Sequence, residues 1–546
     1  MKTKIYIQSF LSVKFIWAVL ALLLLSINSC TDDFVEYNTN KTQMMSVGTK
    51  ELSALFSNAE FRSCNWLTTD NYSRMSSTMA NHLCGFITCG NTIQEQNFMN
   101  LGWHNTGFSR HYTTFVPTIQ SVLEITKDNN IPAYDIALIY KVFVMQQLTD
   151  LWGPIPYTKA GSGDEKIPYE SQKEVYYKMF EDLNKAISSL TSEVQKVPGL
   201  NIFGPGDMIY NGDASKWVKF GNTLRLRLAM RISNIDPEKA KLEAEAAASG
   251  ATLETNADDA LCAVTSWTST GNGLPRMESF FQDVMSTSME SFMVGYNDPR
   301  ISEYWSPVVK DITMDASGYL TEFKSNIGGY HGMTRGFETV WYSYFRSHSK
   351  FGPRFKDGKQ LVTPINMMHA AEAYFLKAEG AWRGWNMGSG TAQSFYEKGI
   401  EISIKQWKGT SYSQTAISSY INSTATPVAP QNYPYNDPPM TNIPVKFSSD
   451  RTIQYEQIHT QKWIALFPVS TEAWAEFRRT RLPKLYRKKY SVNALIIPST
   501  GQIQTRCRFP DSEYIANAAE VEKATLLLKG GVDLENVPLW WDVNPN

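Results

Sequence analysis

Apolar side chains recur at helical spacing in several long stretches of the chain, separated by polar, glycine-rich or proline-rich segments. Residues 134–151 form an apolar run that stops at Gly153-Pro154, a glycine followed by a helix breaker. The stretch from Ser171 to Glu174 matches a capping box, which opens a helix. Six apolar residues then fall on one stripe of that helix: Val175, Met179, Leu183, Ala186, Ile187 and Leu190. The pattern predicts two consecutive helices.

Two further helices are expected directly afterwards. Asp213 can cap a helix that has five apolar residues on its inward face. These are Trp217, Phe220, Leu224, Leu228 and Ile232. Asp236-Pro237 then combines a capping acid with proline at the first helical position, and Gly250 ends this fourth helix. Its narrow face is lined by Ala240, Ala244 and Ala247.

A second helical block begins near Ile365. Ala392, Tyr396 and Gly399 have the small-x3-aromatic-x2-small spacing of the second half of a tetratricopeptide (TPR) unit, and the three alanines above repeat it. Small residues at these positions let two helices approach closely. We therefore expect degenerate, TPR-like helix pairs over about 134–250 and 365–480.

Two more helices are expected within this second block, over residues 453–467 and 470–480. Pro468 stops the first, and Ser470 is expected to cap the second. Three other regions lack helical periodicity. Residues 256–359 are rich in Gly, Ser and aromatics, residues 426–444 carry six prolines, and the tail from Gly530 is irregular. Loops this long are uncommon in compact proteins unless they are functional.

The first thirty residues match a bacterial lipoprotein signal. Three lysines lead into an apolar run over residues 15–25, and small residues then precede Cys30. The run is short for a membrane span, so we expect cleavage before Cys30 and lipidation of that cysteine. A plain secretory signal or an uncleaved anchor is the alternative. Residues 1–29 are thus the signal peptide, and residues 30–48 are an acidic or polar tether.

The charge balance narrows the range of partners. The formal net charge is −1, and removal of the signal peptide takes away three lysines, which leaves about −4. Neither a basic face for nucleic acid nor a polybasic patch for a membrane surface is indicated. The aromatic share of 13% raises the prospect of a stacking site.

Motifs for catalysis or metal binding are absent from the sequence. The seven histidines lack His-Glu-x-x-His spacing, and neither Cys-x-x-Cys nor Gly-x-Ser-x-Gly occurs. The odd cysteine count argues against a disulfide framework, although an oxidising compartment would allow Cys84 to pair with Cys89 or Cys64. Asp258-Asp259 is interpreted as a solvated turn rather than an acid/base pair. We therefore expect no enzymatic activity and no cofactor, and the sequence assigns no metal ligands and leaves a structural metal open.

Three arginines lie on one predicted helix: Arg225, Arg227 and Arg231. They would suit an anion, but buried pairing with Asp or Glu of a neighbouring helix is the commoner arrangement.

Several stretches resemble one family. Residues 152–157 read Trp-Gly-Pro-Ile-Pro-Tyr and resemble the Trp-Gly-x-Ile-Pro-Tyr signature of SusD-like (SusD/RagB) outer-membrane nutrient-binding lipoproteins. Pro154 stands where that family has an acid or amide. Five further stretches are similar to the same family, in the right order along almost the whole mature chain: residues 169–176, 217–231, 461–466, 472–480 and 508–514.

The resemblance implies a mainly α fold, an α-α superhelix in which four TPR-like helix pairs pack against an irregular, loop-rich half. One SusD-like domain would cover residues 49–546, with loop-rich ligand-binding segments at about 60–115 and 256–359. It further implies a lipid-anchored protein of the outer membrane, facing the cell exterior, that caps a SusC-like TonB-dependent barrel. The family binds glycans or other nutrients and is not known for catalysis.

Sugar rings stack on exposed aromatic side chains, which are best presented on loops held by a rigid scaffold. Eight aromatic residues outside the repeats are therefore candidates for ligand binding: Trp66, Tyr72, Trp103, Trp267, Tyr304, Trp305, Trp341 and Tyr344. Core packing or contact with the barrel is the alternative for each of them. Four tryptophans in helical motifs are assigned to the core: Trp152, Trp217, Trp463 and Trp474.

Three functions remain open at this point. The first is a surface lipoprotein that binds an oligosaccharide and delivers it to the barrel. The second is a TPR-like scaffold lipoprotein that binds a protein or peptide and no sugar. The third is a surface glycosidase.

Overall fold

The computed structural model describes residues 48–67, 80–85, 103–164, 166–264, 271–277, 283–308, 328–336, 348–356, 358–432, 435–491 and 494–544. The chain divides into two compact units, Met1–Glu51 and Leu52–Asn546. The second unit holds the described helices and strands, apart from the first residues of helix α3 (Thr49–Leu67).

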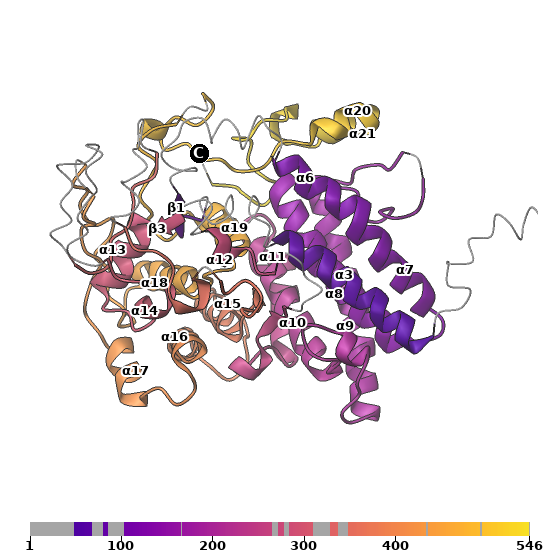
Figure 1. Ribbon diagram of the computed structural model, residues 1–546, viewed down its shortest axis with the longest axis horizontal. Helices are drawn as coiled ribbons and strands as arrows, with labels where there is room; N and C mark the ends of the chain where they lie inside the picture. The colour runs from indigo at the N-terminus through magenta and orange to yellow at the C-terminus, as the bar shows by residue number, and fades with distance from the viewer. Residues whose placement is uncertain are drawn as a thin grey trace, which may run out of the picture. The chain divides into compact units, whose positions relative to one another are not determined.

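The four helices predicted for the first block are present (Figure 1): α8 (Ile131–Trp152), α9 (Gln172–Lys196), α10 (Ala214–Arg231) and α11 (Pro237–Ser249). The Ser171 hydroxyl accepts a hydrogen bond from the Glu174 N–H, and the Glu174 carboxylate accepts one from the Ser171 N–H, which completes the predicted capping box. Asp213 and Asp236 accept hydrogen bonds from N–H groups in the first turns of α10 and α11. Helix α8 packs on α9, and α10 packs on both α9 and α11.

The predicted inward faces of these helices are buried. All six residues of the α9 stripe are buried, as are the three alanines of α11. Trp152, Trp217, Trp463 and Trp474 are at most 2% exposed, which confirms their assignment to the core. No helix in the described part of the chain has both the length and the apolar character needed to cross a bilayer.

The second helical block is also confirmed, and it contains α15 (Ala370–Trp382), α16 (Ala392–Lys408), α17 (Gln414–Ile421), α18 (Arg451–Ala465) and α19 (Ser470–Thr480). Helix α15 packs on α16 and α18. A Cβ atom built on Gly399 would lie 2.9–3.0 Å from ring atoms of Phe375, so a larger residue there would force the buried Phe375 ring of α15 to move. This contact gives a physical reason for the TPR-like spacing.

One detail of this block differs from the prediction. Ser470 is the first residue of α19 and does not cap it, because the N-cap residue is Val469 and has no side-chain capping hydrogen bond. The Ser470 hydroxyl oxygen lies 3.1 Å from Nδ1 of His82 instead. The Ser470 hydroxyl therefore contacts His82, from the N-terminal part of the chain, and not the backbone at the start of α19.

Helices also occur where none was predicted. Residues 60–115 and 256–359 were expected to be loop-rich, but their described parts include α6 (Trp103–Arg110), the π-helix η2 (His111–Phe115), α12 (Leu274–Arg276), α13 (Thr287–Gly295) and α14 (Ile301–Tyr304). Helices α7 (Val116–Thr126), α20 (Asp511–Ala516) and α21 (Ala518–Leu526) were missed as well. The described positions of 426–444 hold neither helix nor strand, as predicted. Short 3-10 turns are η3 (Gly204–Gly206), η4 (Asn256–Asp258), η7 (Pro353–Phe355), η8 (Pro498–Thr500) and η9 (Lys529–Gly531).

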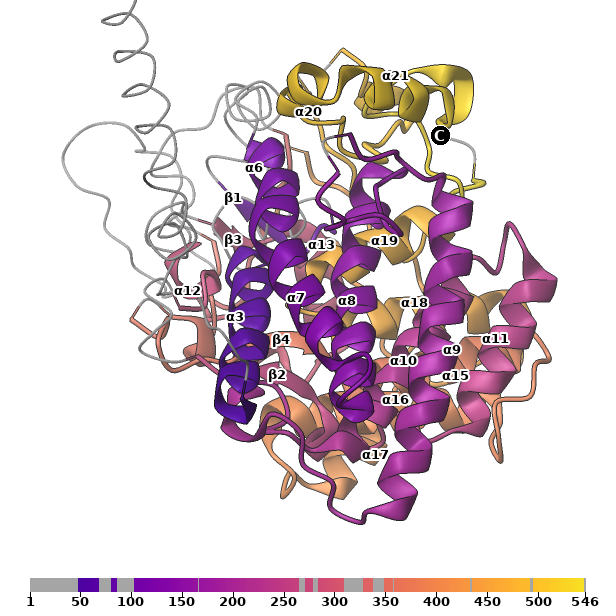
Figure 2. The same cartoon turned by 90° about the vertical axis from the view of Figure 1, so that its right-hand side faces the viewer.

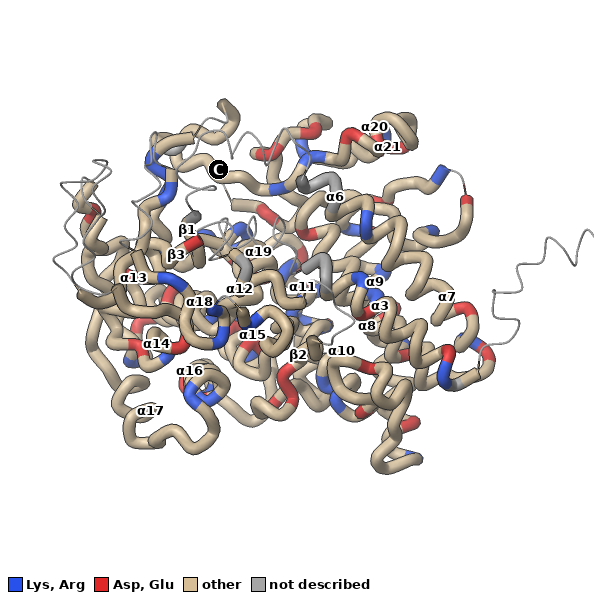
Figure 3. Tube along the Cα trace, in the orientation of Figure 1, with Lys and Arg blue, Asp and Glu red and all other residues tan. Residues whose placement is uncertain are grey.

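Two small antiparallel sheets join distant segments. Strand β1 (Leu83–Gly85) pairs with β3 (Asp283–Met285), and β2 (Ala260–Cys262) pairs with β4 (Ile365–Met368). Figure 2 shows α3, α7, α8 and α9 beside one another, with α15, α16 and α18 behind them. In Figure 3, positive and negative residues are interspersed along the helices, in agreement with the nearly neutral charge.

Candidate functional site

Two of the eight aromatic candidates have described side chains, Tyr304 at the end of α14 and Trp305 directly after it, and both are buried. Tyr304 and Trp305 have no exposed surface. The Tyr304 hydroxyl donates a hydrogen bond to the Ile464 carbonyl (3.1 Å), and its ring lies 4.6 Å from the Phe467 ring. The Trp305 ring stacks on Phe351. The expectation that these two rings are exposed is therefore wrong, because protein covers both faces and the rings belong to the core.

The other candidates are not tested by the structure. Tyr72, Trp267, Trp341 and Tyr344 lie outside the described residues, and so does Cys30. Trp66 belongs to α3 and Trp103 opens α6, but their side chains also lie outside the described part.

The described residues add two exposed tyrosines that sequence reasoning did not select. Tyr435 and Tyr490 are 36% and 37% exposed. Lys489 directly precedes Tyr490 in the chain. Its Nζ lies 5.1 Å from the Tyr435 ring centroid and 2.6 Å from Oδ1 of Asp437. The Lys489 N–H donates to the Arg335 carbonyl (2.9 Å). Three loops therefore meet here, and we call Arg335, Tyr435, Asp437, Lys489 and Tyr490 the tyrosine junction.

A donor-rich hollow of about 60 Å³ adjoins this junction. Its lining combines amide and cationic side chains with aromatic rings: Asn81, Arg335, Arg487, Lys488, Gln502, Gln504, Trp474, Phe477 and Tyr486. The hollow holds only a few water molecules, and the Trp474 and Tyr486 rings in its lining are 1% and 5% exposed, so it admits no sugar ring. The signal for Tyr435 was present in the sequence, since it lies in the proline-rich loop 426–444 whose length suggested a function.

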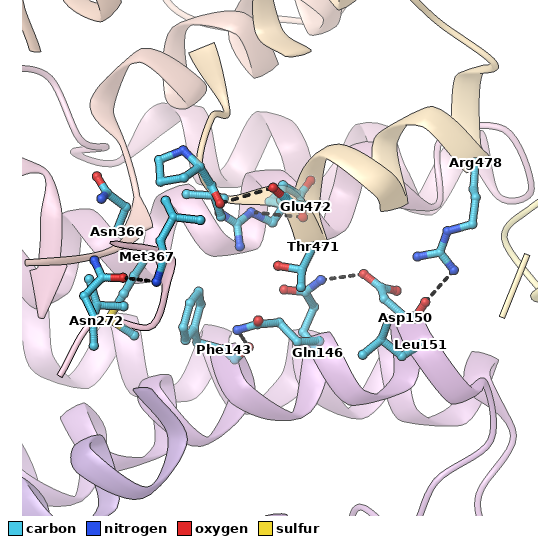
Figure 4. Close-up of a pocket in the computed structure, with 17 residues that line it drawn as sticks. Phe143, Gln146, Asp150, Leu151, Asn272, Asn366, Met367, Thr471, Glu472 and Arg478 are labelled. Carbon is cyan, nitrogen blue, oxygen red and sulfur yellow. Dashed lines mark hydrogen bonds and ion pairs between the residues drawn. The ribbon is translucent and has the colours of Figure 1, made fainter. Parts of the chain in front are cut away.

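A second pocket lies deep between α8, α10, α19 and β4 (Figure 4). The Gln146 amide donates to the Asp150 carboxylate, and the Arg478 guanidinium donates to the Asp150 carbonyl at 2.6 Å. Its volume of about 50 Å³ accommodates a few water molecules and no sugar ring. A glycosidase substrate would therefore not fit between the carboxylates of this pocket.

The charges around this pocket form a buried network across the two helical blocks. Arg227 donates two hydrogen bonds of 2.7 Å to Glu372 of α15. Arg231 lies 2.6 Å from Glu472 and 2.7 Å from Glu476, both of α19. Arg225 pairs with Glu243 of α11 at 2.6 Å. The interpretation that these arginines pair with acids of neighbouring helices is confirmed.

Three groups of the ligand type that binds metals lie together in this network: Glu379, His459 and Glu476. Arg479 already donates hydrogen bonds to both carboxylates, at 2.6–3.1 Å. Burial raises the pKa of Glu379, but Arg479 and Arg383 outweigh it and hold that pKa well below its ordinary value. Burial lowers the pKa of His459 to about 3. A metal would have to displace the guanidinium, so the geometry is that of a structural ion cluster.

The interpretation of Asp258-Asp259 as a solvated turn is wrong. Asp258 and Asp259 are only 5% and 7% exposed. Asp259 accepts a hydrogen bond from the Ala370 N–H at the start of α15 (2.7 Å), and burial raises its pKa to about 7. Asp258 accepts hydrogen bonds from the N–H groups of Glu254 and Thr255. Both carboxylates thus accept hydrogen bonds from backbone N–H groups.

The cysteine side chains show one further detail. The Cys64 sulfur lies 3.7 Å from the Met367 sulfur, whereas the Cys84 sulfur lies 3.4 Å from the Thr334 carbonyl oxygen. Cys64 and Cys84 are therefore not bonded to each other.

Comparison with known proteins agrees with these features. The SusD-like family described as "Susd and RagB outer membrane lipoprotein" matches residues 28–542. A chitin-binding SusD homologue from Flavobacterium johnsoniae is 32% identical, with a TM-score of 0.78, and the match covers 90% of this chain and 99% of that one. A SusD-like protein from Bacteroides thetaiotaomicron is 30% identical, with a TM-score of 0.76 and coverage of 91% and 99%. A SusD homologue from Bacteroides vulgatus is 28% identical, with a TM-score of 0.77 and coverage of 91% and 98%.

None of the curated proteins matches the chain. The family match nevertheless covers nearly the whole chain, and the solved relatives share the fold over almost their entire length. The chain is a member of the SusD/RagB family of outer-membrane lipoproteins.

Proposed function

We propose that the protein binds an oligosaccharide at the cell surface and delivers it to a SusC-like TonB-dependent transporter. The observation that carries the proposal is the relative from Flavobacterium johnsoniae, which is described as chitin-binding and is 32% identical over 99% of its own length. Another structural match, 26% identical with a TM-score of 0.69, is also described as a chitin-binding protein. Chitin-type oligomers are therefore the first ligand class to test.

The tyrosine junction supports this proposal with a suitable surface. Tyr435 and Tyr490 present aromatic rings on loops, and Asp437 and Lys489 supply an acceptor and a donor beside them. The carbon-bound hydrogens of a sugar ring pack on such aromatic faces, while its hydroxyls need polar partners. Six candidates stay part of the proposal as further stacking residues: Trp66, Tyr72, Trp103, Trp267, Trp341 and Tyr344.

Binding without catalysis fits the carboxylates of the described residues. Glycoside hydrolysis needs an acid and a base set about 5–9 Å apart across an open substrate site. Glu372, Glu379 and Glu476 are buried and paired with arginine. The pocket beside Asp150 and Glu472 is too small for a sugar ring. These acids stabilise the fold, and none of them lies in a site that could hold a sugar substrate.

The anchor completes the proposal. Cys30 carries the lipid, residues 30–48 form the tether, and the domain stands on the outer face of the outer membrane. From there a bound glycan is passed to the barrel.

The ligand is tested with soluble protein that begins at Thr31. Titration calorimetry would use N-acetylglucosamine oligomers of four to six units, with malto-oligosaccharides of the same lengths as controls. We expect saturable binding of the chitin oligomers only. Binding of another glycan from a broad panel, without binding of chitin oligomers, would show that the ligand is not chitin-type. Absence of binding throughout the panel would refute the sugar ligand and leave the protein- or peptide-binding scaffold.

Delivery is tested separately, by affinity purification of the lipidated protein from detergent-solubilised outer membrane. We expect a TonB-dependent barrel in stoichiometric amount. A preparation without a barrel would contradict delivery, even if the soluble protein binds glycan.

A further inference from the structure

Helices α20 and α21 carry the most exposed large apolar side chains in the described part of the chain. Ile515 is 86% exposed and Leu526 is 72% exposed. Tyr514, Leu527 and Val532 are 40%, 48% and 43% exposed. Scattered apolar residues are normal on a protein surface, whereas a cluster of them marks a contact surface. We call these five residues the C-terminal apolar face.

This face is held in place by contacts beneath it. The Tyr169 hydroxyl donates to Glu513 (2.8 Å), and the Asn517 amide donates to the Ile167 carbonyl (3.1 Å). Helix α21 buries Val521 and Ala524 on its inner side. The exposed residues therefore belong to an anchored helix pair, which lies next to α6 at one edge of the fold (Figures 1 and 2).

The face also encloses a hollow. The Tyr514 hydroxyl donates to Oδ2 of Asp533 (2.8 Å), which places Tyr514 beside the segment of Val532. Tyr514, Leu526 and Val532 line the same open hollow, together with Ala518 and Glu522. Leu534 adds a fourth aliphatic side chain to Ala518, Leu526 and Val532, and Thr525 and Asp533 complete the lining with Gly531. A single aromatic ring beside four aliphatic side chains suits apolar side chains of a protein better than the stacked rings of a sugar.

Charge restricts the partner further. Residues 511–532 contain four acids and two lysines. Lys523 pairs with Glu520 at 2.7 Å, whereas Glu522 is exposed inside the hollow. We call the acids of residues 511–532 the acidic rim of the face. A second copy of the chain would bring the same acidic rim against it, and anionic lipid headgroups would be repelled as well. The rim is complementary to a surface that carries lysine or arginine.

We propose that the C-terminal apolar face is a docking surface for a protein partner with aliphatic side chains and a basic rim. The partner is the transporter barrel, so this inference rests on the proposed function. Aliphatic contacts at Ile515 and Leu526 would hold the complex, and a basic side chain of the barrel would pair with Glu522.

Site-specific photocross-linking tests the contact in the full lipidated chain, in native outer membrane. Benzoylphenylalanine would replace Ile515 or Leu526, and Leu242 of α11, which is 62% exposed, would be the control position. We expect cross-links to a TonB-dependent barrel from the first two positions and none from the third. Cross-links to a second copy, within the same chain, equally from all three positions, or from none of them would overturn the proposal.

A second measurement separates this inference from the proposed function. The double variant Ile515→Asp with Leu526→Asp should bring down about tenfold less barrel than the unmodified chain, while Leu242→Asp should bring down the same amount. Glycan affinity and melting temperature should stay unchanged, because these side chains are exposed. If the double variant retains the barrel, the docking surface is refuted and delivery stands. If the unmodified chain brings down no barrel, delivery and the docking surface both fail.

Discussion

At the scale of residues, the Tyr435 ring is positioned by the charges around it. The Lys489 ammonium lies 5.1 Å from the ring centroid and is fixed by its salt bridge to Asp437. A sugar would stack on the exposed part of Tyr435, which is 36% of its surface. The same two charges would offer a donor and an acceptor to the hydroxyls of a bound sugar, so stacking and hydrogen bonding would occur at one place.

Tyr435→Ala should therefore weaken glycan binding by about 1–3 kcal/mol, because it removes a stacking side chain. Titration calorimetry on the soluble protein measures this. Tyr514→Ala is a matched control, since Tyr514 is similarly exposed at 40% but lies outside the tyrosine junction. Unchanged affinity of the Tyr435 variant would remove this residue from the binding site.

His82 gives the stability a pH dependence. Its Nδ1 lies 3.1 Å from Ser470 and its Nε2 3.1 Å from the Trp463 carbonyl oxygen, and burial lowers its pKa from 6.5 to about 3. The folded state therefore holds His82 neutral, whereas the unfolded state takes up a proton below pH 6.5. This contribution to stability is complete above pH 6.5 and is lost progressively as the pH falls towards 3.

His82→Gln should remove this dependence. Between pH 7.5 and 5.5 the free energy of unfolding of the unmodified protein should fall by about 1.4 kcal/mol more than that of the variant. Urea unfolding at the two pH values measures the difference. Equal falls in both proteins would show that His82 is protonated in the folded state.

Single residues also show the limit of sequence-based prediction. Tyr304 and Trp305 have the same loop context as an exposed stacking residue, yet Phe351, Phe467 and Ile464 cover them. Those partners lie 46 to 163 positions away in the chain, so local sequence carries no information about them. Tyr435 was overlooked for the converse reason, because only the fold brings its loop to Lys489.

At the scale of elements, helix starts were predictable because their signals are local. Ser171, Asp213 and Asp236 each accept hydrogen bonds from N–H groups two or three residues ahead. Helices α13, α20 and α21 have at most nine residues, too few for a clear helical period. The three- and four-residue strands depend on partners far away in the sequence, which no local pattern identifies.

The capping box of α9 provides a prediction at this scale. Ser171→Ala removes the hydroxyl that accepts from the Glu174 N–H, and should lower the free energy of unfolding by about 1 kcal/mol. Ser192→Ala, at an exposed position near the other end of the same helix, should change it little. Urea unfolding compares the two variants. Equal losses would mean that the box does not fix the start of α9.

At the scale of the whole molecule, the buried ion network joins helices from both blocks. Arg231 of α10 contacts Asp150 of α8, and Glu472 and Glu476 of α19. Burying an unpaired charge is costly, so it was predictable that the arginines of α10 would pair with acids. The sequence could not predict which acids these would be, since Glu472 is 241 positions away from Arg231 in the chain. The network therefore sets how the two helical blocks fit together.

Arg231→Met tests the weight of this network. The change leaves Asp150, Glu472 and Glu476 buried without their shared guanidinium, and should lower the free energy of unfolding by about 3–5 kcal/mol. Arg225→Met is the matched control on the same helix, because Arg225 is 12% exposed and its ion pair is with Glu243 alone. The Arg225→Met variant should lose clearly less free energy of unfolding, since water can solvate part of that site. Urea unfolding at pH 7.5 measures both, and equal losses would show that the contact between the blocks depends on apolar packing rather than on the shared cation.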